Sequence, residues 1–288
     1  MDFKRKREEV IGVLKEMDIP YEIDTADVIK MNDMHLYGIV FQQGDIGKTL
    51  YLNEFADADL SAAEMAEELL TACETSADIP PFELMDNLAS GQSLSEISDN
   101  LFVALVGDER NKEFLDQVVS KRVGSGLSFI CQIRFNTGDG VLSTNITKEL
   151  AVSNHWDEEE LFTLATVNSS EKNPAVLCRM NDALFMDNRT DLLESEEKVI
   201  GEMMILSNRT GLFGAAAMFL PGVIDKIHEK IEEAFFAIPS SVHEFIIIPE
   251  SSGMTMPALN AMCREANESV VRYNEILSDN VLYMPYNR

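Results

Sequence analysis

The sequence predicts an α+β protein with mixed or antiparallel sheets and single helices packed on them. Its strand-like runs arrive in groups of two or three, and they do not alternate regularly with helices as in a doubly wound parallel sheet. The segment 201–250 holds the densest apolar runs. Within it Phe245–Ile248 is apolar at successive positions, as expected for an inner strand covered on both faces. Apolar residues recur at helical spacing over Val223–Ile231, which predicts a helix on one side of that sheet.

Residues 1–80 predict an N-terminal αβββα unit. Apolar periodicity predicts the following order of elements: a helix over Lys4–Met17, strands over Tyr21–Met31, His35–Gln43 and Thr49–Phe55, and a helix from about Ser61 to Cys73. The stretch that follows contains two adjacent prolines and many serines and threonines, so residues 81–98 are the expected linker. Residues 99–288 form a larger α+β part centred on 201–250.

Two hairpins are predicted within the larger part. The turn residues Asn136–Gly140 separate the strand-like runs Leu127–Phe135 and Val141–Ile146. A second hairpin or tight corner is expected at Pro239–Ser241, where two β-rich runs meet. The remaining expected elements are helices over Asn111–Ser120, from Trp156, over Pro174–Met186 and over Thr255–Val271, and a final strand over Val281–Met284.

The net charge of −27 over 288 residues limits the classes of ligand. Direct binding to nucleic acid or to an anionic membrane surface needs clustered Lys and Arg, so both are disfavoured. Between Lys48 and Arg110 the chain has no basic residue and fourteen acidic ones. The simplest interpretation is a solvated acidic face that keeps the protein soluble. The more specific interpretation is a binding surface for a basic partner, including a surface that imitates nucleic acid.

The remaining composition predicts a cytoplasmic protein without a membrane segment, metal or cofactor. The four cysteines lie far apart without a CxxC pair, which is typical of a reduced protein. No apolar run approaches the roughly 18 residues of a membrane helix, and the charged start MDFKRKREE is not a secretory signal. The four histidines have no metal-ligand spacing.

Nucleotide-binding and hydrolase motifs are absent from the sequence or incomplete. Gly44–Thr49 resembles the end of a phosphate-binding loop, but Gln42 occupies the place of the first glycine and a strand is expected next. We therefore interpret it as a hairpin turn. Neither GxSxG nor GxGxxG occurs.

The best candidate catalytic residues lie in Pro239–Glu244. Ser240, Ser241, His243 and Glu244 offer a hydroxyl, an imidazole and a carboxylate, and Asp279 or Asn208 is a candidate third group. On a strand, Ser241 and His243 would point the same way and Glu244 the opposite way. The favoured alternative is a corner closed by serine hydroxyls, with a half-buried histidine bonded to the backbone.

Five stretches together resemble a known family. They are KTLYLNEF, ALVGDERNKEFL, RTGLFGAAAMFLPGVIDKI, FFAIPSSVHEFIIIPE and YNEILSDNVLYM. In order and over nearly the whole chain, they resemble an uncharacterised family of bacterial proteins found mainly in gut-dwelling, anaerobic, Gram-positive bacteria. The resemblance implies one full-length architecture and a bacterial cytoplasmic setting. The family has no established activity, so it implies no catalytic residues.

We therefore expect a non-catalytic cytoplasmic binding or regulatory protein, with the acidic region 49–109 as the surface for a basic protein partner. The competing hypothesis is a hydrolase or transferase that uses Ser240, Ser241, His243 and Glu244. The sequence leaves the oligomeric state open.

Overall fold

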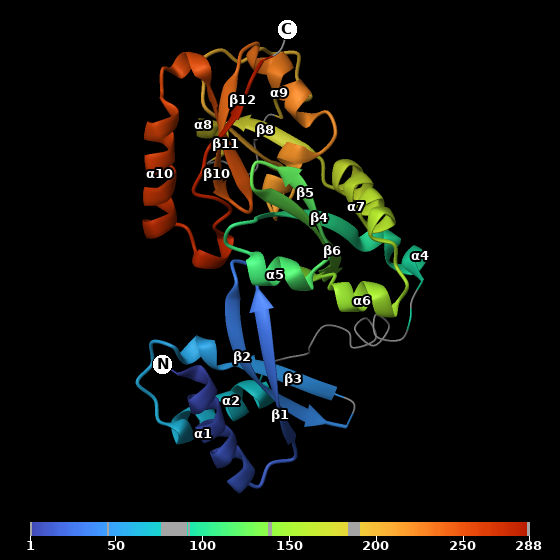
Figure 1. Cartoon of the computed structure of the whole chain (residues 1–288), viewed down its shortest axis with the longest axis vertical. Helices are drawn as coiled ribbons and strands as arrows, with labels where there is room; N and C mark the ends of the chain where they lie inside the picture. The colour runs from blue at the N-terminus through green and yellow to red at the C-terminus, as the bar shows by residue number, and fades with distance from the viewer. Residues whose placement is uncertain are drawn as a thin grey trace. The chain divides into compact units, whose positions relative to one another are not determined.

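The computed structural model describes residues 2–44, 46–75, 91, 93–137, 140–183 and 191–286. The chain divides into two compact units, Met1–Leu84 and Met85–Arg288. Helices and three antiparallel sheets make up the fold, so the predicted α+β class is confirmed (Figure 1). Most of the expected linker 81–98 lies outside the described residues, and its described end contains the short helix α4 (Leu94–Ile97).

The N-terminal unit is a three-stranded antiparallel sheet with two helices. Its elements are α1 (Phe3–Glu16), β1 (Glu22–Lys30), β2 (Met34–Gln43), β3 (Ile46–Tyr51), the 3-10 helix η1 (Leu52–Phe55) and α2 (Ala62–Thr75). The core joins the apolar stripes of both helices to the middle strand, with Leu14, Phe41 and Leu69 fully or almost fully buried. The third strand ends sooner than expected because η1 turns Leu52 into this core.

A four-stranded antiparallel sheet opens the C-terminal unit. Its elements are η2 (Ser98–Asn100), β4 (Leu101–Gly107), α5 (Lys112–Gln117), β5 (Ser120–Gly124), β6 (Leu127–Thr137), β7 (Gly140–Asn145), α6 (Lys148–Ser153) and α7 (Glu158–Lys172). The long strand β6 pairs with β4, β5 and β7. The antiparallel β6–β7 pair confirms the hairpin predicted from the runs Leu127–Phe135 and Val141–Ile146. Helix α7 lies against this sheet (Figure 1). The Asp157 side chain caps α7 by accepting a hydrogen bond from the Glu160 N–H.

A five-stranded antiparallel sheet in the order β12-β10-β11-β9-β8 completes the unit. Its elements and their neighbours are β8 (Ala175–Arg179), α8 (Met180–Ala183), β9 (Met204–Asn208), the 3-10 helix η4 (Gly214–Phe219), α9 (Val223–Ile231), β10 (Phe235–Ser241), β11 (Glu244–Pro249), η5 (Glu250–Ser252), α10 (Met256–Ser269), η6 (Tyr273–Glu275) and β12 (Leu282–Met284).

Strand β11 is the central strand, and its successive apolar residues face two cores, as predicted. Phe245 and Ile247 belong to the large core, which also holds η4 and the four-stranded sheet. Ile246 and Ile248 belong to a smaller core under α10 (Figure 1). Burial on both faces therefore explains why the strand has no polar alternation.

The expected helix over Pro174–Met186 is wrong. Ala175–Arg179 forms strand β8, which pairs with β9, and only Met180–Ala183 is helical. Residues 184–186 lie outside the described part of the chain. Ala175–Arg179 is compatible with either state by itself, and the pairing with β9 decides it.

Candidate functional site

The expected corner at Pro239–Ser241 is displaced along the chain. These three residues end β10, and the hairpin turns at Val242 and His243 with an irregular register beside them. The His243 N–H donates a hydrogen bond to the Ser241 Oγ at 3.1 Å. Ser241 therefore closes the turn by bonding backbone two residues on, as serine commonly does.

The imidazole of His243 is also bonded to backbone. Its Nδ1 accepts a hydrogen bond from the Phe213 N–H at 3.0 Å, so the neutral ring has its proton on Nε2. Nε2 lies 3.9 Å from a carboxylate oxygen of Glu275. The only lone pair of the neutral ring is thus taken by a backbone donor. A general base must direct that lone pair at a nucleophile, and His243 does not.

The other corner residues are not arranged as a catalytic group either. The Ser240 hydroxyl lies 3.3 Å from a carboxylate oxygen of Glu244, and the contact is a weak one. In the described part of the chain, no hydrogen bond joins the hydroxyl of Ser240 or Ser241 to the His243 ring. The Asn208 amide donates to the Leu212 carbonyl at 2.9 Å. These bonds stabilise turns.

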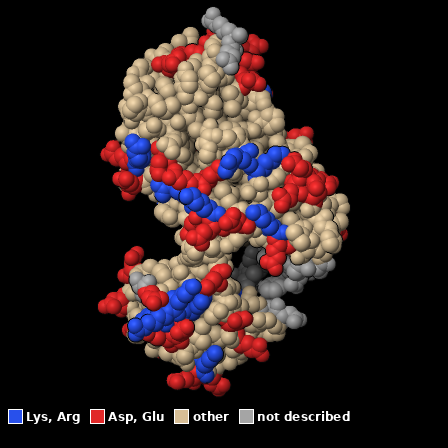
Figure 2. Space-filling view, viewed as in Figure 1, with Lys and Arg blue, Asp and Glu red and all other residues tan. Residues whose placement is uncertain are grey.

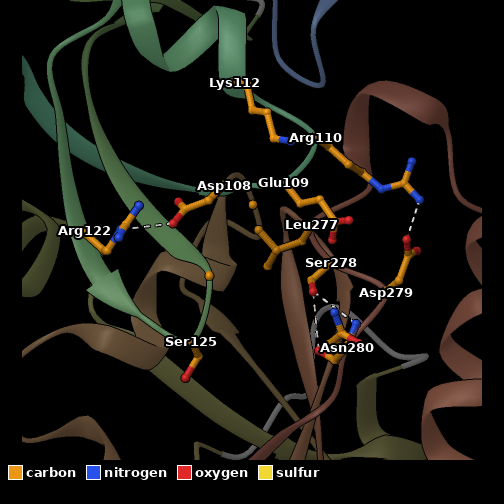
Figure 3. A pocket seen from close by; sticks show the side chains of 12 residues that line it. Asp108, Glu109, Arg110, Lys112, Arg122, Ser125, Leu277, Ser278, Asp279 and Asn280 are labelled. Carbon is orange, nitrogen blue, oxygen red and sulfur yellow. Dashed lines mark hydrogen bonds and ion pairs between the residues drawn. The ribbon is translucent and has the colours of Figure 1, made fainter.

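Asp279 lies in a separate polar pocket of about 360 Å³ at the end of β4 (Figure 3). Figure 3 shows Arg110 reaching across to Asp279, and the two side chains are 2.6 Å apart. Asn267 donates a further hydrogen bond to Asp279 at 2.8 Å. Burial by itself raises the pKa of the Asp279 carboxyl, but the hydrogen bonds from Asn267 and Arg110 and the nearby basic charges hold it below its usual value.

This polar pocket offers paired charges. Besides the Arg110–Asp279 pair, Arg122 lies 3.2 Å from Asp108, and Lys112 also lines the cavity. On the face drawn in Figure 2, basic and acidic side chains are likewise interspersed over this part of the C-terminal unit. Because both arginines already have carboxylate partners, the pocket has little net attraction for a charged ligand.

A second pocket contains the buried cation Arg134, which sequence reasoning missed. Arg134 lies on β6 and is 8% exposed. Its guanidinium donates to the Val103 carbonyl at 3.0 Å and to the Gln132 side chain at 2.9 and 3.1 Å. Burial lowers the pKa of Arg134 to about 10, which leaves it charged at neutral pH. The cavity beside it measures about 200 Å³.

The sequence does contain a signal for Arg134. In the segment Phe129–Phe135 the residues Gln132 and Arg134 are two positions apart in an otherwise apolar strand. Alternation along a strand places both on one face, so a polar pair is predicted within a buried sheet. Such a pair needs hydrogen-bond partners inside the protein.

Phe213 joins the corner to Arg134. Its backbone is left-handed, with φ of 51°, which is unusual for a bulky residue. The hydrogen bond to His243 holds this conformation, and the Phe213 ring then lies 5.1 Å from the Arg134 guanidinium. The Phe102 ring lies 5.2 Å from the same group. His243 therefore positions a side chain that contacts the buried cation.

The part of the chain that the structure describes contains no group of three or more His, Cys, Asp or Glu residues that could hold a metal ion. All four cysteines are buried free thiols. Burial raises the pKa of Cys131 to about 12 and that of Cys263 to about 11, so neither is a ready nucleophile. None of the helices described is both long enough and apolar enough to span a bilayer.

The acidic region of the sequence divides between the two units. In the N-terminal unit, seven carboxylates on η1, α2 and the loop between them are exposed, and we call them the α2 acidic face: Glu54, Asp57, Asp59, Glu64, Glu67, Glu68 and Glu74. Asp78, Glu83 and Asp86 lie outside the described residues, and Glu96 to Glu109 belong to the C-terminal unit. The basic residues of α1 are in the same unit as the α2 acidic face.

These features define a class: an α+β protein of two compact units, with polar pockets and with its serine–histidine corner bonded to backbone. The chain belongs to DUF5688, a family of unknown function whose model matches residues 2–288. No curated protein and no solved structure matches the chain. The family membership confirms the resemblance to an uncharacterised family.

Proposed function

We propose that this protein is a non-catalytic binding or regulatory protein of the bacterial cytoplasm, and that the α2 acidic face binds a basic protein partner. The observation that supports the proposal most strongly is that η1, α2 and the loop between them carry these seven exposed carboxylates and no Lys or Arg. Helical spacing turns Met65, Leu69 and Cys73 inward, so the acidic residues of α2 point to solvent.

The carboxylates of the α2 acidic face are available to a partner. None of the seven forms an ion pair with a described residue. Glu64 is partly committed, because hydrogen bonds from Ser61 lower the pKa of its carboxyl and the Lys6 charge adds to this. Like charges held close together repel, and a basic partner relieves that repulsion and is steered toward the face.

An enzyme that uses Ser240, Ser241, His243 and Glu244 is the weaker proposal. It requires His243 to give up the Phe213 N–H and to turn its lone pair toward a hydroxyl. Imitation of nucleic acid is a special case of the favoured proposal, in which the basic partner is a DNA-binding protein.

The test is retention of a host protein by three forms of the full chain. One variant has Glu67, Glu68 and Glu74 changed to Gln. The matched control removes three exposed carboxylates elsewhere, by changing Glu229, Glu265 and Glu268 to Gln. We expect wild type and control to retain the same partner at low salt, and the α2 variant to retain about tenfold less.

The dependence of retention on salt and the competition with duplex DNA are two further measurements. Retention should fall as ionic strength rises toward about 0.3 M, because screening shortens the reach of exposed charges. Displacement of the partner by duplex DNA would favour nucleic-acid imitation. Equal retention by the α2 variant and wild type would contradict the proposal.

A further inference from the structure

The Arg134 guanidinium has donors that no described residue uses. A guanidinium has five N–H groups. Nε bonds Gln132, and Nη2 bonds Gln132 and Val103. Both N–H groups of Nη1 therefore lack an acceptor among residues that the structure describes. A buried donor without an acceptor is unfavourable, and a buried charge is more so.

The charge of Arg134 is also uncompensated. No carboxylate in the described part of the chain pairs with it. The rings of Phe102 and Phe213 offer cation–π attraction, which offsets only part of the loss of hydration. In a protein of net charge −27, an arginine buried without a carboxylate partner is an unusual arrangement.

The cavity beside Arg134 suits a small anion. Its lining includes Arg134, Lys172, Asp99, Asn173 and Thr210. Lys172 lies 2.8 Å from Asp99, so this pair is neutral overall and Arg134 leaves the cavity with a net charge of +1. A volume of about 200 Å³ is large enough for a phosphate or a small carboxylic acid.

We propose that this cavity binds a small oxyanion, a phosphate or carboxylate group, through the free Nη1 edge of Arg134. The geometry of a guanidinium matches such oxygens well. The site goes beyond the proposed function and is independent of it, since it lies in the C-terminal unit and the α2 acidic face lies in the N-terminal unit.

The polar pocket of Figure 3 is the weaker candidate for an anion. Its Arg110 and Arg122 are paired with Asp279 and Asp108, so an anion there would have to displace a carboxylate. This difference supplies a matched control. Arg122→Gln removes one positive charge from the same unit without touching the Arg134 cavity.

The experiment is calorimetric titration of the full chain with inorganic phosphate and, separately, with succinate. We expect saturable 1:1 binding of at least one of the two. Arg134→Gln should weaken it about tenfold or more, because a charge-assisted bond to a buried donor is lost. Arg122→Gln should bind within about twofold of wild type.

A second variant keeps the test decisive if Arg134→Gln does not fold. Val141 lines the cavity and is 41% exposed, so Val141→Trp blocks the mouth while Arg134 stays in place. It should weaken binding as much as Arg134→Gln. Absence of saturable binding by wild type, or equal binding by wild type and Val141→Trp, would overturn the proposal. Phosphate binding without succinate binding identifies a phosphate ligand, and the reverse identifies a carboxylate.

Discussion

Gly214→Ala should lower the free energy of unfolding of the C-terminal unit by about 3 kcal/mol or more. Gly214 begins η4, which is buried in the large core. A Cβ atom at this position would lie 2.1 Å from the Ser207 Oγ, 2.5 Å from the His243 carbonyl oxygen and 2.7 Å from the Asn208 nitrogen. Two of these neighbours are backbone atoms of β9 and the hairpin, so relief requires the strands to move.

Thermal unfolding measures this effect. For a unit of about 200 residues we expect the melting temperature to fall by roughly 6–12 °C. Ser207→Ala/Gly214→Ala is the informative second variant. It removes the hydroxyl but leaves both backbone contacts, so the double variant should stay far below Ser207→Ala alone. A double variant as stable as Ser207→Ala would contradict the packing described here.

Gly107→Ala should also be strongly destabilising, by about 2–3 kcal/mol. Gly107 ends β4 and is buried, and a Cβ atom there would lie 2.1 Å from the Leu277 carbonyl oxygen. The segment around Leu277 crosses the end of β4 and then supplies Asp279 to the polar pocket. The added methyl group therefore separates the C-terminal segment from the sheet.

Chemical denaturation of Gly107→Ala beside Gly12→Ala tests this explanation. A Cβ atom on Gly12 would meet nothing within 4 Å, and Gly12 lies within helix α1. Gly12→Ala should leave stability unchanged or raise it by up to about 1 kcal/mol. If both variants unfolded at the wild-type denaturant concentration, the close approach of Leu277 to Gly107 would not matter to stability.

Apolar spacing and turn residues predicted those elements that depend only on residues close together in the chain. Helix α1 and the β6–β7 hairpin follow from apolar spacing and from turn residues within a short window. The central position of β11 followed from its four successive apolar residues, because only a strand covered on both faces tolerates them. The class of the fold therefore needed no long-range information.

Strand β8 shows where local reasoning stops. Its sequence, Ala175–Arg179, follows the long helix α7. The five residues include no turn residue that would distinguish a strand from a second helix. Its state is decided by pairing with β9, about 30 residues along the chain. No window that omits β9 contains that information.

The corner shows a second limit. A strand model places Ser241 and His243 on the same face, but the turn at Val242 and His243 breaks the alternation. The partner of the His243 ring is the N–H of Phe213, 30 residues earlier. Every residue except proline has a backbone N–H, so residue types do not indicate which one bonds the ring. Residue types alone therefore predicted a group of candidates and could not predict how their side chains are bonded.

Arg134 was missed for a related reason. An arginine in a strand is usually exposed, and nothing local indicates that Phe102 and Phe213 come from other elements to cover it. The polar Gln132 two residues earlier was the available signal. Two polar residues on one face of a buried strand predict an internal network, and the structure shows one in which Arg134 also lines the cavity.

We expect the Ser241–His243 corner to stabilise the fold through its bonds to backbone, and thermal melts of His243→Ala and Ser241→Ala beside wild type test this most directly. His243→Ala leaves the part-buried Phe213 N–H without its acceptor, which costs on the order of 1–3 kcal/mol and lowers the melting temperature by roughly 2–12 °C. Ser241→Ala should lower it less, because its bond closes only the turn. Catalytic residues are commonly held at a cost to stability. Two variants that melt at or above the wild-type temperature would contradict a stabilising role for the corner.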